Sequence, residues 1–281
     1  MSEIKVENVT YVHAKGTPYE IKALDNVDIT IPKGVITGII GHTGSGKSTL
    51  VQMFNGILKP ECGRVLLDGA DIWSKPKKIR DVRFKVGLVM QYPEYQLFEE
   101  TVYKDIAFGP RNMGVKESEI KERVREAIAF VGLSPDVLEK SPFDLSGGQK
   151  RRAAIAGIIA MRPDVLVLDE PAAGLDPRGR DSIFNNISEY QKKSGITVVI
   201  VSHSMEDMAK YCDNLIVMHE GRVSMEGTAE QIFSKSEILS SIGLDIPQAT
   251  KLVLKLKEKG INVDVGAYTV EQALDALLGL Y

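Results

Sequence analysis

The chain has 281 residues, a formal net charge of −3 and an isoelectric point near 5.9. This length accommodates one large α/β domain and a small appendage, and the slightly acidic balance argues against a nucleic-acid partner, which normally needs a basic surface. The two cysteines, Cys62 and Cys212, lack the spacing of metal ligands and suggest a reducing compartment. No signal peptide or membrane-spanning run is recognisable, so we expect a cytoplasmic protein that reaches a membrane only through partners.

Short β-rich runs separated by turns fill residues 1–90, and an apolar run over 35–40 predicts a buried strand. Lysines and arginines gather between residues 75 and 85, and we interpret this cluster as a solvated face.

The loop after the 35–40 run matches G-x-x-x-x-G-K-[ST], and residues 49–54 after it are compatible with a helix. Glycines let backbone N–H groups approach a β-phosphate, and a helix N-terminus adds a favourable dipole. Lys47 can reach the β- and γ-phosphates, and the Ser48 hydroxyl can bind Mg²⁺. The alternative is a glycine-rich turn that happens to contain a lysine. The predicted ATP-binding residues of this segment are Gly41, His42, Thr43, Gly44, Ser45, Gly46, Lys47, Ser48 and Thr49.

A helical periodicity replaces the strand pattern over residues 101–145, where Ile120, Val124, Ile128 and Val131 recur on one face. Ser146-Gly147-Gly148 then opens a predicted helix whose N-terminus offers unobstructed backbone donors to an anion.

A second apolar run, Val165 to Leu168, ends in Asp169-Glu170. Open α/β sheets bind their ligands at the C-terminal ends of strands. We therefore predict that Asp169 holds Mg²⁺ and that Glu170 is the general base for the attacking water. Adjacent acids at a strand end also occur without function, but the glycine-rich loop upstream favours the catalytic interpretation.

Six motifs in order resemble those of the ATP-binding-cassette (ABC) ATPases over about residues 1–230. They are the glycine-rich loop at 41–48, called Walker A, Gln91 after the run 86–90, the LSGGQ signature at 145–149, the acidic pair, the segment 172–176 and His203. The resemblance implies an α/β fold: an ABC-type P-loop NTPase core with a β-rich N-terminal subdomain and a helical signature subdomain at about 101–160.

The resemblance also implies roles for these residues. Glu170, His203 and Gln91 would be catalytic, and Mg²⁺ would be held by Ser48, Gln91 and Asp169. The signature would bind the γ-phosphate of ATP in the opposite protomer, so the site would be divided across a dimer. The residues implied in this trans contact are Ser146, Gly147, Gly148, Gln149 and Asp176.

Residues 231–281 differ in character and predict a small C-terminal helical domain. One helix is expected to begin at Pro247 and end near Gly260, and Thr269 with Gln272 resembles a capping box for a second helix. The two helices either pack on their own domain or form a dimerisation appendage, and we favour the appendage because such short helices bury little surface alone.

Three features resemble the energy-coupling-factor (ECF) ATPases, most closely the second of two paralogues in vitamin-importing modules. They are the segment from Gln91 to Pro110, the Gly-His-Thr-Gly-Ser-Gly sequence of the Walker A loop and the two-helix tail. This resemblance implies a paralogous ATPase partner (a homodimer being possible), a transmembrane coupling protein and a substrate-binding membrane subunit, at the cytoplasmic face of the cell membrane. Acidic and aromatic side chains mix in this segment, and we expect them to contact arginines of the coupling protein. The expected coupling residues are Glu94, Tyr95, Glu99 and Glu100.

Two positions depart from the ABC pattern. The aromatic residue that stacks on adenine aligns with His13, which offers less stacking area, and Ala172 replaces a usual serine or threonine. We still expect an active site because Glu170 and His203 are present. The alternatives are a nickel or cobalt importer ATPase, a soluble non-transport ABC ATPase and a non-hydrolysing ATP-gated subunit, whose general base would be lost.

Overall fold

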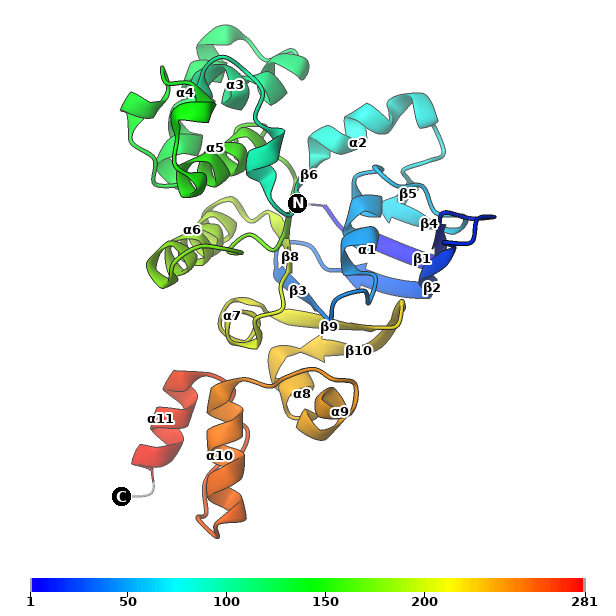
Figure 1. The fold of residues 1–281 in the computed structure, drawn as a ribbon, viewed down its shortest axis with the longest axis vertical. Coiled ribbons are helices and arrows are strands. Elements are labelled where there is room, and N and C mark those ends of the chain that lie inside the picture. The colour runs from blue at the N-terminus through cyan, green and yellow to red at the C-terminus, as the bar shows by residue number, and fades with distance from the viewer. Residues whose placement is uncertain (1, 280–281) are drawn as a thin grey trace.

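The computed structural model describes residues 2–279 as two sheets, a helical subdomain and a C-terminal helical pair (Figure 1). The smaller sheet is antiparallel with strand order β2-β1-β4-β5. Its strands are β1 (Ile4–His13), β2 (Ile21–Ile31), β4 (Cys62–Leu67) and β5 (Ala70–Asp71).

The larger sheet has the order β10-β9-β3-β8-β7-β6, and all of its pairings are parallel except that of the edge strand β10. Its strands are β3 (Ile36–Ile40), β6 (Val86–Val89), β7 (Val165–Asp169), β8 (Thr197–Val201), β9 (Asn214–His219) and β10 (Arg222–Thr228). Strands β3, β6, β7 and β8 are buried at every residue, which is why they appear in the sequence as continuous apolar runs.

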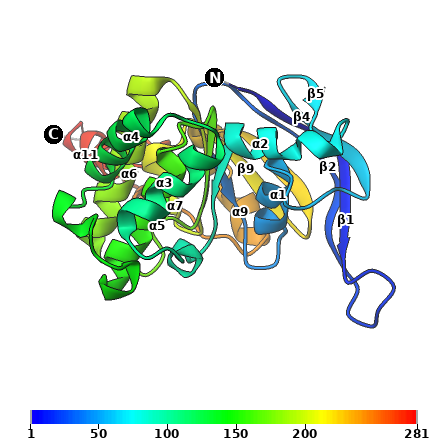
Figure 2. The same ribbon diagram turned by 90° about the horizontal axis from the view of Figure 1, so that it is seen from above.

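Helix α1 (Lys47–Phe54) packs its apolar side chains into the core between the two sheets. Helices α3 (Val102–Asn112), α4 (Glu117–Phe130) and α5 (Gly147–Ile159) form the expected helical subdomain, which stands to one side of the sheets in Figures 1 and 2. The four residues predicted to share one face of the 101–145 block, Ile120, Val124, Ile128 and Val131, are all buried in the main core. The periodicity predicted this face correctly.

The basic run is partly helical, which the sequence interpretation did not anticipate. A 3₁₀ turn (Pro76–Lys78) leads into α2 (Ile79–Lys85), and Ile79 and Val82 pack against the inter-sheet core. The lysines and arginines lie on its exposed side, as expected for a solvated face.

Helices α6 (Pro177–Ser194) and α7 (Met205–Tyr211) contribute buried side chains to the main core. After β10 come α8 (Ala229–Phe233), α9 (Ser236–Ser241), α10 (Gln248–Glu258) and α11 (Val270–Leu278). No helix within residues 2–279 is both long enough and apolar enough to cross a membrane.

The C-terminal segment expected to begin at residue 231 contributes to two apolar clusters. The main core includes Phe233, Leu239 and Ile246, so α8 and α9 pack as part of the ATPase domain. A separate apolar cluster begins at Ala249 and joins α10 to α11. Residue 231 as the start of a separate domain stays a prediction, since a composition change at 230 does not reveal which core the following short helices join.

Candidate functional site

The glycine-rich loop connects β3 to α1, and its backbone is held in conformations that favour glycine. Gly46 is the N-cap of α1 with φ of 98°, and a Cβ placed there would lie 2.4 Å from the Ala23 carbonyl oxygen. Gly41 has φ of 154°, and its added Cβ would lie 2.4 Å from the Met218 carbonyl oxygen. A side chain at either position would therefore distort the cradle.

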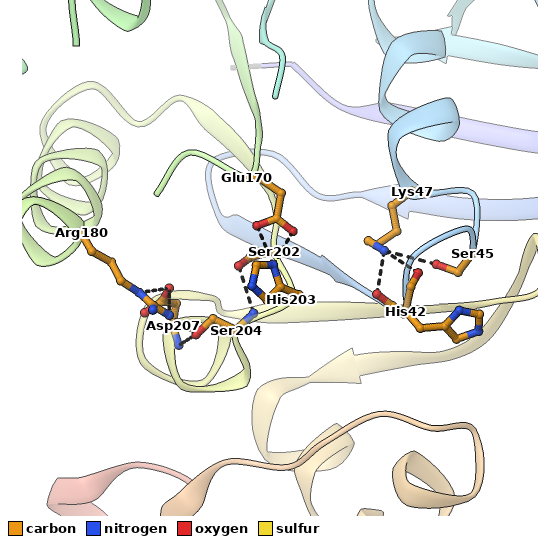
Figure 3. Close-up of polar contacts among 10 residues, drawn as sticks. His42, Ser45, Lys47, Glu170, Arg180, Ser202, His203, Ser204 and Asp207 are labelled. Carbon is orange, nitrogen blue, oxygen red and sulfur yellow. Dashed lines mark hydrogen bonds and ion pairs between the residues drawn. The ribbon is translucent and has the colours of Figure 1, made fainter. Parts of the chain in front are cut away.

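Lys47 is held inside this loop. Its Nζ donates to the carbonyl oxygens of Gly41 at 2.6 Å and His42 at 2.8 Å (Figure 3). Burial lowers the pKa of the ammonium, and the nearby Glu170 and Asp169 carboxylates oppose this effect. The amine is thus positioned at the cavity, with two loop carbonyls as its hydrogen-bond acceptors.

A cavity of about 330 Å³ opens over the loop. It is lined by His13, Ile21, Ala23, Thr43, Gly44, Gly46, Lys47, Ser48, Thr49, Gln91, Asp169, Glu170 and Val201. The structure therefore brings the Walker A loop together with both acids and Gln91. His13 also reaches it, and its Nε2 lies 3.1 Å from Thr49 Oγ1.

Oxygen ligands suited to Mg²⁺ meet in this cavity. Asp169 ends β7, is nearly fully buried, and interacts with the Ser48 hydroxyl. Desolvation raises the pKa of Asp169, while the hydrogen bond from Ser48 lowers it. A hydroxyl, a carboxylate and the Gln91 amide form a donor set that fits a hard cation.

Glu170 and His203 face each other across the mouth of the site (Figure 3). His203 Nδ1 lies 3.0 Å from both Oε1 and Oε2 of Glu170. Glu170 has φ of 52°, in the left-handed region, and its N–H donates to the Val201 carbonyl, so the chain turns sharply as β7 ends. This unfavourable conformation directs the carboxylate into the cavity.

A supporting contact behind His203 was not anticipated from the sequence. Arg180 on α6 donates from Nε to Asp207 Oδ2 at 2.8 Å and also donates to the Ser204 hydroxyl (Figure 3). Ser204 in turn caps α7 by accepting from the Asp207 N–H. The segment carrying His203 is therefore tied to α6, a contact that no local motif reveals.

A second pair of histidines was also missed. His42 Nε2 lies 3.2 Å from His219 Nδ1, and the two rings pack edge to face. This contact joins the Walker A loop to the end of β9, across 177 residues of sequence.

The signature lies apart from this cavity. Ser146 and Gln149 form a capping box at the start of α5, as the sequence suggests for a helix opening there. A Cβ added at Gly147 would meet nothing within 4 Å, so the first turn of α5 is open. None of Ser146, Gly147, Gly148 and Gln149 lines the cavity of its own chain, and Asp176 caps α6 instead, by accepting from the Gly179 N–H.

The segment after Gln91 requires one correction. Glu94 does not present a free carboxylate, because both its oxygens accept from Arg151 of the same chain at 3.1 Å. Tyr95 is exposed, Glu99 is half-buried, and Glu100 pairs with Lys104 one turn along. Glu94 and Glu100 are thus both paired within the chain, and Glu99 has no side-chain partner among the described ion pairs. The sequence did not reveal that Arg151, two residues after the signature, would form an ion pair with Glu94.

The comparison with family models agrees with this geometry. The model described as ABC transporter matches residues 24–173, and a model of an AAA domain matches residues 139–208. Among curated proteins, the "Energy-coupling factor transporter ATP-binding protein EcfA2" of Clostridium acetobutylicum is 54% identical over 98% of this chain and 96% of its own length. The protein of the same name from Clostridium tetani is 52% identical over 99% of this chain and 97% of its own length.

The chain belongs to the ECF group of ABC transporter ATPases. This ECF-type ATPase also resembles solved structures. CbiO1 of Clostridium perfringens, described as part of the ABC transporter complex CbiONQ, has a TM-score of 0.75 and 42% identity over 92% of this chain and 96% of its own. The ATP-binding cassette MJ0796, solved as a dimer in a post-hydrolysis state bound to ADP and Pi, has a TM-score of 0.74. It is 27% identical, and the match covers 80% of this chain and 98% of its own. The predicted fold class is confirmed, and the protein is an ATP-binding and ATP-hydrolysing ABC ATPase.

Proposed function

We propose that this ECF-type ATPase hydrolyses ATP to drive substrate uptake by an energy-coupling-factor transporter at the cytoplasmic face of the membrane. The observation that carries the chemical part is the convergence of Lys47, Asp169 and Glu170 on one cavity, with His203 in contact with Glu170. The transporter assignment is supported by the names of near full-length relatives.

In the proposed mechanism, Lys47 leaves the Gly41 and His42 carbonyls to bind the β- and γ-phosphates. Glu170 accepts the proton of the attacking water on a carboxylate oxygen, as a general base does in related phosphoryl transfers. Ser48, Asp169 and Gln91 would hold Mg²⁺, which neutralises phosphate charge when bound. His13 would stack on the adenine.

The contact between His203 and Glu170 limits which ring nitrogen of His203 can donate a hydrogen bond. An ionised carboxylate can only accept a hydrogen bond, so the contact of Nδ1 with an ionised Glu170 places the proton of a neutral ring on Nδ1 and leaves Nε2 without one. Donation from Nε2 to a phosphate therefore requires the imidazolium form or release of Glu170. Release also frees the Glu170 carboxylate to accept a proton from water. We therefore propose that ATP binding separates His203 from Glu170 and lets His203 Nε2 donate to a phosphate.

The signature would complete a site in another protomer. Its first helical turn is open and lies away from the cavity of its own chain, which leaves the α5 N-terminus available to an anion presented in trans. We propose a heterodimer with a paralogous ATPase in which Ser146 to Gln149 and Asp176 contact the partner's nucleotide. The dimeric MJ0796 structures support pairing in cassettes of this fold.

The proposed membrane contact is a groove of about 330 Å³ beside the Gln91 segment. Phe98 and Phe108 meet edge to face at 5.0 Å on its wall, with both rings substantially exposed, and Asp105 lies within it. Exposed apolar surface bordered by carboxylates suits an amphipathic helix carrying arginines. Glu99, Glu100 and Tyr95 would lie along this contact.

The occupant we propose is a cytoplasmic helix of the transmembrane coupling protein, and the cargo would be a vitamin or similar micronutrient held by a separate membrane subunit. The relatives' names favour this over the nickel or cobalt importer. The test is purification of tagged protein from membranes with identification of the attached subunits. Phe98→Ala with Phe108→Ala should lower recovery of the membrane partner at least tenfold, while Tyr19→Ala, which removes an exposed aromatic elsewhere, should not. Unchanged recovery in the groove variant would exclude this groove.

A further inference from the structure

The segment after Gln91 is joined to the signature helix by one ion pair that the ATPase mechanism above does not use. Arg151 donates to Glu94 through Nε to Oε2 and through Nη2 to Oε1, both at 3.1 Å. The side chains are 4% and 18% exposed. Two parallel bonds fix orientation as well as distance, so this contact holds the 3₁₀ turn Pro93–Gln96 rigidly against α5.

The turn before Glu94 is shaped around the same guanidinium. Tyr92 has φ of 57°, a left-handed conformation that a bulky residue rarely adopts, and its ring lies 5.7 Å from Arg151 Cζ. Pro93, which follows, is buried. A cation–π contact and a two-point ion pair thus hold both sides of a strained turn from a single residue of α5.

Stability alone does not account for this arrangement. Arg151 Nη1 is buried and has no hydrogen-bond partner in the described chain, residues 2–279. An unsatisfied donor on a buried charge is costly, and buried ion pairs are commonly no better for stability than apolar replacements. What the pair supplies is a defined geometry between two segments 57 residues apart.

One segment borders the ATP cavity, and the other carries the signature that the proposed function assigns to a nucleotide in trans. Gln91 lines the cavity of its own chain, three residues before Glu94. Gln149, in the capping box that opens α5, is two residues before Arg151 on the same helix. Movement of the Gln91 loop on nucleotide binding would therefore pass through the pair to the signature.

We propose that Glu94 and Arg151 are positioning residues that couple occupancy of this chain's ATP cavity to the placement of its signature helix. This rests on the proposed function, in which the signature serves a nucleotide in trans. The pair touches no nucleotide itself, and it acts by making the turn and the helix move as one body.

The test compares Glu94→Gln, which removes the charge and one acceptor, with Arg151→Lys, which cannot form the two-point contact. Glu119→Gln is the matched control, because Glu119 pairs with Arg123 within the same subdomain but away from both segments. The double variant Glu94→Leu/Arg151→Met replaces the pair with apolar side chains in case single variants fold poorly. Amide hydrogen exchange is measured on the full chain with and without a non-hydrolysable ATP analogue, and ATPase activity is measured on the assembled complex.

In the wild-type chain, the analogue should slow exchange in residues 41–48 and alter exchange in residues 147–152 at least threefold. Glu94→Gln and Arg151→Lys should keep the first response and lose the second, with kcat falling about tenfold at unchanged KM. Glu119→Gln should resemble the wild type in both.

An unchanged response of residues 147–152 in both pair variants, or its absence in the wild type, would overturn the proposal. Loss of both responses together, with a lower unfolding temperature, would show a merely structural role and would overturn it equally. If the wild-type complex hydrolyses no ATP, the proposed function fails, but the exchange comparison still decides this inference.

Discussion

Glu170 and His203 show how a backbone conformation places chemistry. The left-handed φ of Glu170 turns its carboxylate toward the cavity, and the imidazole of His203 contacts both oxygens. The contact connects β7 with the segment after β8, which lie side by side in the parallel sheet. The acid and its imidazole neighbour are therefore brought together by strand order.

Replacing Glu170 with Gln should lower ATP turnover about 10²–10⁴-fold, because the amide cannot accept the proton of the attacking water. Nucleotide affinity should stay close to wild type, since Lys47 and the loop are unchanged. Steady-state ATPase assays and equilibrium nucleotide binding measure the two effects. Lys47→Ala is the contrasting variant and should weaken binding itself. Near wild-type turnover in Glu170→Gln would assign the base elsewhere.

Asp68 gives a pH-dependent contribution to stability at the N-terminal edge. Burial raises the pKa of its carboxyl. Hydrogen bonds from the Ser2 hydroxyl, the Glu3 N–H and Lys33 lower it by more, so the net effect is a fall from 3.8 to about 2. Within that window the unfolded chain binds more protons than the folded chain, so stability rises with pH. The contribution is present above pH 3.8 and is lost as pH falls toward 2.

Asp68→Asn should therefore destabilise the protein at pH 7, and its difference from wild type should shrink as pH falls below about 4. Urea midpoints of both proteins at several pH values measure this. A difference that stays constant with pH would mean that the neutral hydrogen bonds, rather than the charge, carry the effect.

At the scale of single elements, the N-terminus of α5 is both a capped helix end and part of the signature. The same Ser146 and Gln149 that cap the helix belong to the signature predicted to face a nucleotide. Helix α8 has an equivalent capping box made by Thr228 and Gln231, but it is packed beside β10 and away from the signature. The two boxes allow capping to be separated from nucleotide contact.

Ser146→Ala and Thr228→Ala should each cost about 1 kcal/mol of stability, the usual effect of losing an N-cap. Only Ser146→Ala should also lower the ATPase activity of the assembled complex, by about tenfold or more, because it also removes a predicted contact to nucleotide. Denaturant unfolding and ATPase assays measure the two properties. Equal activity losses in both variants would trace the effect to helix stability alone.

At the scale of the whole molecule, helix α11 carries an exposed apolar stripe. Val270, Leu274 and Leu278 follow one another at four-residue spacing on α11, and each is more than half exposed. Ala273 and Leu277 turn instead toward α10, where a small cluster joins the two helices. This arrangement supports the expected dimerisation appendage, because a partner surface would bury the stripe.

Leu274→Glu should weaken association of the nucleotide-free ATPase pair at least tenfold while leaving the unfolding temperature of the isolated chain nearly unchanged. Ile238→Glu is the matched control, since Ile238 on α9 is similarly exposed but lies off the stripe. Sedimentation across a concentration range gives the association constants. Equal weakening by both variants would point to general solubility effects, and no weakening by Leu274→Glu would place the dimer contact elsewhere.

The sequence by itself determined the local chemistry: the glycine-rich loop, the buried strands, the acidic pair and the capped helices. These signals are readable because they depend on residues within a few positions of each other. Gly46, for instance, follows a buried run and precedes a helix, and the structure places it at the N-cap of α1. The same holds for the predicted box at Thr269 and Gln272, which caps α11.

Only the tertiary structure decided which distant side chains meet. Arg180 behind His203, His219 beside His42, and Arg151 on Glu94 each come from another element, and nothing in the residues next to them selects these partners. Glu94 shows the consequence, since a carboxylate that the sequence offered to another subunit is satisfied within its own chain. Local patterns specify what an element is, whereas the packing of elements determines which of its polar groups remain free.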